Sequence, residues 1–185
     1  MNDNRFLPKR GNYRSLIAYK KAECIYDITY HFAHRFLSKG DRTVDQMVQA
    51  ARSGKQNIAE GSAASATSSE TEIKLINVAR ASFQELLADY EDYLRVRGLE
   101  LWNKTSEKAI IARKVCSEHN DSAFYMERME ARGDEAIANI AITLIYQEDV
   151  FLRRLLDRLQ KNFVANGGIR ESMTRARLAY RDKNR

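Results

Sequence analysis

The sequence predicts an all-α fold: an antiparallel, up-and-down four-helix bundle with a short helical insertion before its last helix and a basic C-terminal tail. Helix-breaking residues are scarce, with one proline and eight glycines among 185 residues. Apolar residues recur every three or four positions along four long stretches, which is typical of amphipathic helices. No alternating run of branched residues precedes an Asn-Gly or Asp-Gly turn, so no hairpin is predicted.

The first long helix is predicted over residues 13–37, after a basic N-terminal arm over residues 1–12. Gly40 is predicted to end this helix, because glycine readily adopts the left-handed conformation of a helix C-cap. The apolar stripe of this helix has helical spacing and consists of Ile17, Ile25, Ile28, Phe32 and Phe36.

The second helix is predicted to begin after an N-cap at Asp41 or Thr43 and to end near Glu60. Small and polar residues fill positions 61–69, and we interpret this stretch as a loop. The apolar stripe of the helix consists of Val44, Met47, Val48, Ala51 and Ile58.

The third helix has the strongest amphipathic pattern in the sequence. Its N-cap is predicted at Ser68 or Ser69, with Glu72 placed for a capping box. Gly98 stops it. Its apolar stripe consists of Ile73, Ile76, Ala79, Phe83, Leu86, Leu87, Tyr90 and Leu94.

Residues 99–132 are less regular and form the predicted insertion, with short helices near residues 106–118 and 124–129. The last long helix is predicted over residues 134–165 and ends at an Asn-Gly-Gly sequence. The basic tail, residues 169–185, follows. Four amphipathic helices with short connections bury their stripes by packing around one centre, which predicts the bundle.

Residues 13–168 are therefore assigned to one bundle domain. Cys24 and Cys116 lack a CxxC spacing, and we interpret them as free thiols in a reducing compartment. No apolar stretch suits a secretory signal or a membrane-spanning helix, so the cytoplasm is the expected location.

Charge is unevenly distributed, although the whole chain carries a formal net charge of +6. Basic residues are in excess in residues 1–62 and again in residues 169–185, whereas acidic residues are in excess in residues 63–100. Two basic ends are compatible with a polyanionic partner.

A sequence motif in the second and third helices carries a resemblance. An Asn-Ile-Ala-Glu-Gly run at positions 57–61 is followed by a pattern made of Ala79, Ser82, Glu85 and Leu86. This combination resembles the four-helix-bundle family of 23S rRNA intervening-sequence proteins and of accessory proteins of diversity-generating retroelements. The match covers residues 13–100 and continues into the last helix, as in the subgroup with a C-terminal suffix region. Many relatives have an Ile-Pro step where this chain has Gly54-Lys55.

The resemblance implies a fold, a habit of assembly and a class of partner. Members of the family form antiparallel bundles that associate into rings, typically pentamers. The retroelement branch uses a basic ring surface to bind nucleic acid and a reverse transcriptase. Because a fold does not determine a function, the resemblance predicts the bundle more strongly than the partner.

Four polar residues of the motif have two interpretations: Asn57, Glu60, Ser82 and Glu85. They could form a ligand pocket inside the bundle. The favoured interpretation is structural: Asn57 and Glu60 cap the end of the second helix, and Ser82 and Glu85 are their partners on the third. Buried polar groups require such partners, since an unpaired one costs about 1–3 kcal/mol.

Neither a metal site nor a catalytic site is predicted. His31 and His34 are three residues apart, but no Glu-x-x-His motif is present to complete a helical metal site. The acidic stripe of the third helix, which contains Asp89 and Asp92, is interpreted as a solvated or intersubunit face. A nucleophile elbow and a phosphate loop are also absent from the sequence. The prediction is a protein without catalytic activity or cofactor.

The candidate nucleic-acid-binding residues are the basic residues near the two ends of the chain. Arginine and lysine neutralise phosphates, and the interleaved Tyr13, Tyr19 and Tyr180 could stack on exposed bases. The alternative is a solvated basic surface that pairs with the acidic helix of a neighbouring subunit. The candidates are Lys9, Arg10, Arg14, Lys20, Lys21, Arg153, Arg154, Arg158, Lys161, Arg170, Arg175 and Arg177, followed by Arg181.

Two functions follow from these observations. The preferred hypothesis is an oligomeric helical-bundle adaptor that binds RNA or DNA, and a reverse transcriptase is a further candidate partner. The alternative is a protein–protein interaction module with no nucleic-acid role, for which Leu99, Leu101 and Trp102 are candidate contacts.

Overall fold

A computed structural model describes residues 12–184, and these residues are helical with no strand among them. The predicted all-α class is confirmed. The elements are the short 3-10 helix η1 (Tyr13–Ser15) and the helices α1 (Ile17–Phe36), α2 (Arg42–Ala64), α3 (Ser69–Val96), α4 (Glu107–Glu118), α5 (Ser122–Met129), α6 (Asp134–Asn166) and α7 (Ile169–Lys183).

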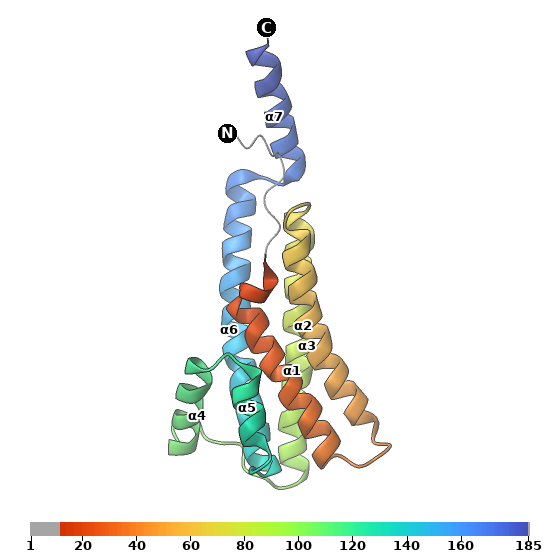
Figure 1. Ribbon diagram of the computed structural model, residues 1–185, viewed down its shortest axis with the longest axis vertical. Coiled ribbons are helices and arrows are strands. Elements are labelled where there is room, and N and C mark those ends of the chain that lie inside the picture. The colour runs from red at the N-terminus through yellow and green to blue at the C-terminus, as the bar shows by residue number, and fades with distance from the viewer. Residues whose placement is uncertain (1–11, 185) are drawn as a thin grey trace.

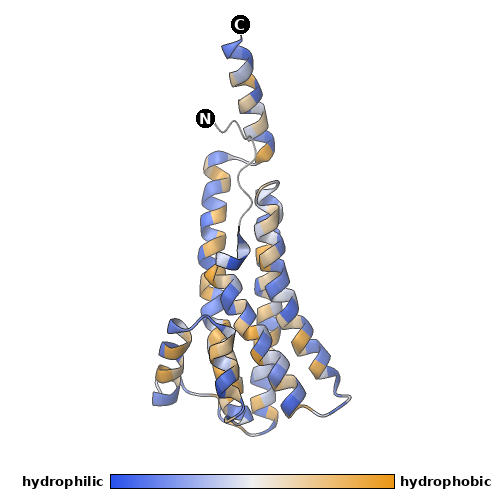
Figure 2. Cartoon of the chain, viewed as in Figure 1, coloured by the Kyte–Doolittle hydropathy of each residue, from blue (hydrophilic) through white to orange (hydrophobic). Residues whose placement is uncertain are grey.

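The four long helices α1, α2, α3 and α6 lie side by side along the long axis of the molecule (Figure 1). Helix α1 packs against α2 and α6, and α3 packs against the same two helices. Their shared centre contains fully buried side chains such as Phe32, Phe83 and Tyr90. Figure 2 shows orange and blue alternating along these helices, as amphipathic helices require.

The predicted insertion forms two short helices at one end of this assembly. Helix α4 packs on α6, and α5 packs on α1. The connection before α4 is held by Asn139, whose side chain is buried in α6. Its oxygen Oδ1 accepts a hydrogen bond from the backbone N of Trp102 at 2.8 Å, and its Nδ2 donates to the carbonyl of Glu100 at 2.8 Å.

The second helix is longer than predicted. We expected a loop over residues 61–69, but α2 continues to Ala64 and contains Gly61. A Cβ at Gly61 would approach Ile76 Cδ1 to 3.3 Å, and a Cβ at Gly54 would lie 2.5 Å from Phe83 Cζ. Both glycines are therefore packing positions where α3 approaches α2 closely, rather than signals of a loop or a kink.

The caps of α2 and α3 agree with the predictions only in part. Asp41 caps α2 by accepting a hydrogen bond from the backbone N of Thr43 at 2.9 Å. Ser68 caps α3 by accepting one from Thr71 N at 3.1 Å. Thr71 thus holds the third helical position, and the capping box predicted for Glu72 is wrong because Glu72 lies one residue further along.

The basic tail is helical. Gly167 has a φ of 70° and ends α6, after which α7 continues away from the four long helices (Figure 1). The carboxylate of Glu171 accepts a hydrogen bond from Gly168 N at 2.9 Å, which caps the start of α7. No residue of α7 is buried.

Among the described helices, none combines the length and the apolar character that crossing a bilayer demands.

Candidate nucleic-acid interface

The tertiary structure brings basic residues from the two ends of the chain together. Arg154, Arg158 and Lys161 are separated by four and three residues, so they share one face of α6, and all three are exposed. Arg154 and Arg158 line a hollow of about 360 Å³, whose other wall is residues 15–18, where the end of η1 meets the start of α1. We call this surface, together with Arg14 and Lys20, the basic corner.

The start of α1 adds positive potential to the basic corner. Its first turn contains no acidic residue, and a helix N-terminus carries a partial positive charge. Arg14 and Lys20 are exposed beside it. The rings of Tyr13 and Tyr19 meet edge to face with centroids 4.7 Å apart, so two aromatic side chains lie next to these cations. On such a surface, the cations can bind phosphates and the aromatic rings can stack on exposed bases.

Arg153 and Arg175 are exposed but engaged by other groups. Arg153 Nη2 lies 2.8 Å from Asp149 Oδ2, and Asp149 also pairs with Arg80 at 3.0 Å. Arg175 donates hydrogen bonds to the carbonyl oxygen of Asn166 and to the hydroxyl of Ser172, so it stabilises the break between α6 and α7. These two arginines therefore have structural roles in addition to any role in binding.

Helix α7 presents the remaining candidates on a projecting surface. Ile169, Met173, Ala176 and Tyr180 follow spacings of four, three and four, which places them in one stripe. Arg170, Arg177 and Arg181 form a row along one side of that stripe by the same spacing rule, and all three are exposed. Tyr180 is 71% exposed. Lys9 and Arg10 lie outside the described residues.

Lys21 is not a surface residue, so its assignment to the interface was wrong. Its side chain is fully buried between α1, α4 and α6. The ammonium group donates to the carbonyl of Cys116 at 2.6 Å and to Oε1 of Gln147 at 3.0 Å. Cys116 lies in the last turn of α4, where free carbonyls attract a cation. Burial lowers the pKa of Lys21.

Glu148 is a second buried ionisable residue, and it was not among the predicted site residues. The side chain is fully buried, and neither carboxylate oxygen has a hydrogen-bond partner among the described residues. Burial raises the pKa of Glu148 well above its usual value, and the positive charge of Lys21 opposes that shift. A signal was present, because Glu148 lies four residues from both Leu144 and Leu152 and therefore falls in the apolar stripe of α6.

The polar motif of α2 and α3 is structural, but not in the predicted way. Because α2 extends to Ala64, Asn57 does not cap its end. Its Nδ2 instead donates to the carbonyl of Ser53 at 2.9 Å, and the hydroxyls of Ser53 and Ser82 are 2.9 Å apart. Glu60 and Glu85 are exposed and make no hydrogen bond within the described residues, so their predicted pairing with this network is wrong.

An acidic groove lies between α2 and α3, on a different surface from the basic corner. It has a volume of about 610 Å³ and is lined by Asp45, Glu85 and Asp89 among other polar residues. Burial raises the pKa of Asp89, and the neighbouring Asp92 and Glu85 add to the shift. Its negative charge makes this groove unsuited to nucleic acid.

Neither the histidines nor the cysteines form a reactive centre in the described part of the chain. No group of three or more metal-binding side chains is close enough there to hold an ion. His34 Nδ1 lies 2.8 Å from the carbonyl of Tyr30. Cys24 and Cys116 are free and buried. Burial raises the pKa of Cys24 to about 12 and that of Cys116 to about 11, so the thiolate forms that attack electrophiles are scarce at neutral pH.

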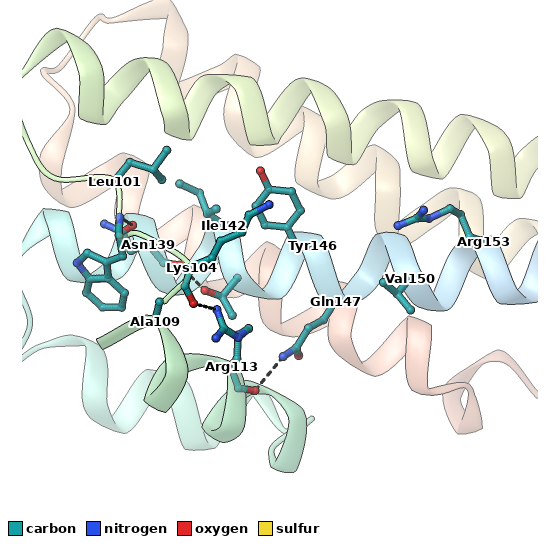
Figure 3. Close-up of a pocket in the computed structure, with 12 residues that line it drawn as sticks. Leu101, Lys104, Ala109, Arg113, Asn139, Ile142, Tyr146, Gln147, Val150 and Arg153 are labelled. Atoms are coloured by element: carbon teal, nitrogen blue, oxygen red, sulfur yellow. Dashed lines mark hydrogen bonds between the residues drawn. The ribbon is translucent and has the colours of Figure 1, made fainter. Parts of the chain in front are cut away.

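The candidate protein-contact residues lie beside a hollow between α4 and α6. Leu101 is exposed, whereas Leu99 and Trp102 are partly buried against the core. The hollow has a volume of about 390 Å³. Figure 3 shows Leu101 and Tyr146 on one side of it, with Lys104 and Arg113 nearby. Arg113 donates to the carbonyl of Lys104 at 2.7 Å, which holds the start of the insertion against α4.

Comparison with family models, with characterised proteins and with solved structures gives no match to this chain. The family resemblance is therefore supported by the quoted residues alone. The assignment of a function depends on the geometry and charge of the surfaces just described.

Proposed function

We propose that this protein is a non-enzymatic, oligomeric adaptor that binds RNA or DNA through the basic corner. The observation that carries the proposal is the convergence of exposed cations from η1, α1 and α6. Arg154 and Lys161 form no ion pair with any described residue, whereas Arg153 is paired with Asp149. Arg158 forms no direct ion pair there either, but its charge acts on the nearby carboxylate of Glu72. Unpaired surface cations gain most from replacing counterions at a phosphate backbone.

The finer fold assignment belongs to the same proposal. We assign α1, α2, α3 and α6 to an antiparallel up-and-down bundle, as in the family that the sequence resembles. The closed cycle of contacts among the four helices supports this topology, as do the opposite directions of successive long helices in Figure 1. The free, buried thiols support a reducing compartment such as the cytoplasm.

Self-association into a ring is proposed from complementary surfaces. The acidic groove and the basic residues of α6 and α7 lie on different parts of one chain. Contact between unlike surfaces of successive copies is heterologous, and it closes into a ring when the rotation between copies permits. A pentamer and a reverse transcriptase partner follow from the family resemblance, and a ring would repeat the basic corner around one rim.

The experiment is a binding titration with fluorescently labelled single-stranded RNA and duplex DNA at low salt. The double variant Arg154→Glu/Arg158→Glu reverses two central charges of the basic corner. We expect it to weaken binding at least tenfold. The matched control is Lys39→Glu, which reverses an exposed charge in the α1–α2 connection. Equal affinities for the double variant and the wild type would contradict the proposal, as would no binding by the wild type at a salt concentration of roughly 50 mM, where phosphate contacts are strong.

The second candidate function is a protein–protein interaction module. The observation that favours it is the uncovered apolar stripe of α7, with Met173 and Tyr180 exposed. Replacing both by Ser removes the apolar contact and leaves the arginine row unchanged. If α7 serves protein contacts, the variant loses oligomer mass in light scattering while it keeps nucleic-acid affinity. If the variant instead keeps its oligomer mass and loses nucleic-acid affinity, α7 binds nucleic acid. Trp102→Ala provides the same test for the insertion.

A further inference from the structure

A cavity separates α4 from α5, away from the basic corner. Its volume is about 530 Å³. Ile111 and Val115 of α4 form one wall, Phe124 and Met129 of α5 form the opposite wall, and α6 closes the floor at Ile140. Trp102 completes the lining. This volume falls within the roughly 300–1,000 Å³ of sites for small organic ligands, which are lined mainly by apolar side chains.

The cavity results from the way in which the two short helices pack. Helix α4 buries small residues, Ala109, Ala112 and Cys116, and it packs on α6. Helix α5 packs on α1 instead. The larger apolar residues of α4, Ile110 and Ile111, are 50% and 54% exposed. A surface helix of a globular protein normally turns its large apolar residues toward the core. In α4, Ile111 instead borders an apolar space between α4 and α5.

The charged groups of the cavity wall have one sign. Lys108, Arg128 and Arg132 line it, and no carboxylate does. The Arg128 guanidinium lies 4.0 Å from the centroid of Phe124, and the Lys108 ammonium lies 5.9 Å from that of Trp102. The cations therefore border the aromatic walls. Lys108 and Arg128 pair with carboxylates outside the lining, whereas Arg132 has no ion pair among the described residues.

Trp102, which lines both this cavity and the hollow between α4 and α6, has a hydrogen-bond donor that is unpaired within the described part of the chain. The indole N–H of Trp102 is buried and has no acceptor among the described residues. A buried donor without an acceptor costs about 1–3 kcal/mol, which a ligand oxygen or a water would offset. An apolar space with a cationic border and a spare donor is complementary to an amphipathic anion.

We propose that this cavity binds a small amphipathic carboxylate, with its aliphatic or aromatic body between α4 and α5 and its carboxylate at Arg132 and Lys108. Small size follows from the volume of about 530 Å³, which suits a small organic molecule. Negative charge follows from Arg132, which has no ion pair among the described residues, and from the absence of any carboxylate in the lining. Arginine is suited to this role because its planar guanidinium binds a carboxylate through two parallel hydrogen bonds.

The sole tryptophan of the chain reports binding, because Trp102 lies in the cavity wall. Since Trp102 also lines the hollow between α4 and α6, charge-reversal variants are needed to locate the site. The experiment titrates the full-length protein with dodecanoate, below its micelle concentration, and records tryptophan emission. Dodecyltrimethylammonium and dodecyl maltoside are the controls, because they have the same alkyl chain with a cationic or a neutral head. We expect saturable binding of one dodecanoate per chain, at least tenfold tighter than either control. Equal affinities for the three compounds would overturn the proposal.

Charge-reversal variants locate the site. Arg132→Glu is expected to weaken dodecanoate binding at least tenfold, and Arg132→Lys, which keeps the charge but not the two parallel hydrogen bonds, is expected to weaken it less. Lys114→Glu is the matched control, because Lys114 is an exposed residue of α4 that does not line the cavity. Circular dichroism of each variant confirms that the helices are intact. Equal losses in Arg132→Glu and Lys114→Glu would refute the site.

Two further measurements distinguish the cavity from the basic corner and from a membrane-binding surface. Arg154→Glu/Arg158→Glu is expected to keep full dodecanoate affinity, since the basic corner is a different surface; a loss there would contradict a separate site. Vesicles that contain an anionic phospholipid test a membrane surface as the source of the anion. Binding to such vesicles with no binding of free dodecanoate would overturn the proposal of a small-molecule site.

Discussion

The buried pair Lys21 and Glu148 allows the sharpest stability prediction. Both side chains are fully buried. Lys21 has two hydrogen-bond acceptors, whereas the Glu148 carboxylate has no donor among the described residues. Glu148→Leu removes an unsatisfied polar group from the core. Lys21 loses a nearby negative charge but keeps both of its hydrogen-bond acceptors, the carbonyl of Cys116 and Oε1 of Gln147. We therefore expect this substitution to stabilise the protein.

The magnitudes follow from the two environments. Removing the unsatisfied Glu148 carboxylate should add about 1–3 kcal/mol to the free energy of unfolding. At about 2–4 °C per kcal/mol for a chain of this size, the melting temperature rises by roughly 2–12 °C. Lys21→Met alone should cost about 3–5 kcal/mol, because it leaves a buried carboxylate without a counter-charge. Once Glu148 is Leu, the same lysine substitution should cost only about 1 kcal/mol.

The assay is urea unfolding followed by circular dichroism for all four members of this double-mutant cycle. The protein concentration is held constant, because any self-association makes the apparent stability depend on it. Additive effects of the two substitutions, or a loss of more than about 2 kcal/mol in Glu148→Leu, would refute the reasoning, since either result means that Glu148 makes favourable contacts in the fold.

The same variants predict a dependence on pH. Burial raises the pKa of Glu148, so the folded state binds a proton more tightly than the unfolded state. The contribution to stability is therefore full below the usual pKa of glutamate and is lost as the pH rises through the raised folded-state value. The wild type should lose more stability than Glu148→Leu as the pH rises from below the usual pKa of glutamate through the raised value of the folded state. Burial lowers the pKa of Lys21 and the charge of Glu148 opposes that shift, so the pKa of Lys21 should fall further in Glu148→Leu.

Three further predictions concern packing, the insertion and the thiols. Gly54→Ala should destabilise the protein by about 1–3 kcal/mol in thermal melts, because the new Cβ would lie 2.5 Å from Phe83 Cζ. Gly133→Ser is the control, because no atom lies within 4 Å of the new Cβ. Gly133 is the N-cap of α6, where serine is favoured, so this variant should keep or slightly raise the stability. Asn139→Ala should shift the emission of Trp102 to the red, because the backbone N of Trp102 loses its acceptor; an unchanged spectrum would contradict this role. The two cysteine thiols, whose pKa values are about 12 and about 11, should react with a disulfide reagent at about pH 8 only after unfolding in urea. Rapid reaction of the folded protein would disprove their burial.

Helical periodicity predicted the long helices well because each of them buries one apolar stripe. It failed where one residue type serves two purposes. Gly61 and its small neighbours have the composition of a loop, yet they lie in α2 and allow α3 to approach it. A loop and a packing position have the same residue types, and only the position of the partner helix distinguishes them. The position of Glu148 in an apolar stripe was visible in the sequence. Its burial was not predicted, because a charged residue type is normally expected at the surface.

The candidate interface was less accessible to sequence reasoning. The basic character of both ends was evident, but their convergence depends on the packing of α1 on α6. Lys20 and Lys21 are adjacent in sequence and face opposite environments, because successive helical residues are about 100° apart. The cavity between α4 and α5 was not predictable, since it depends on which long helix each short helix contacts.

The salt dependence of nucleic-acid affinity tests the central claim most directly. If Arg14, Lys20, Arg154, Arg158 and Lys161 contact phosphates, the logarithm of the binding constant for duplex DNA should fall with a slope of about −4.5 against the logarithm of salt concentration. Reversal of Arg154 and Arg158 should reduce the steepness of that slope by about 2. A slope near zero for the wild type, or an unchanged slope in the double variant, would contradict binding at the basic corner.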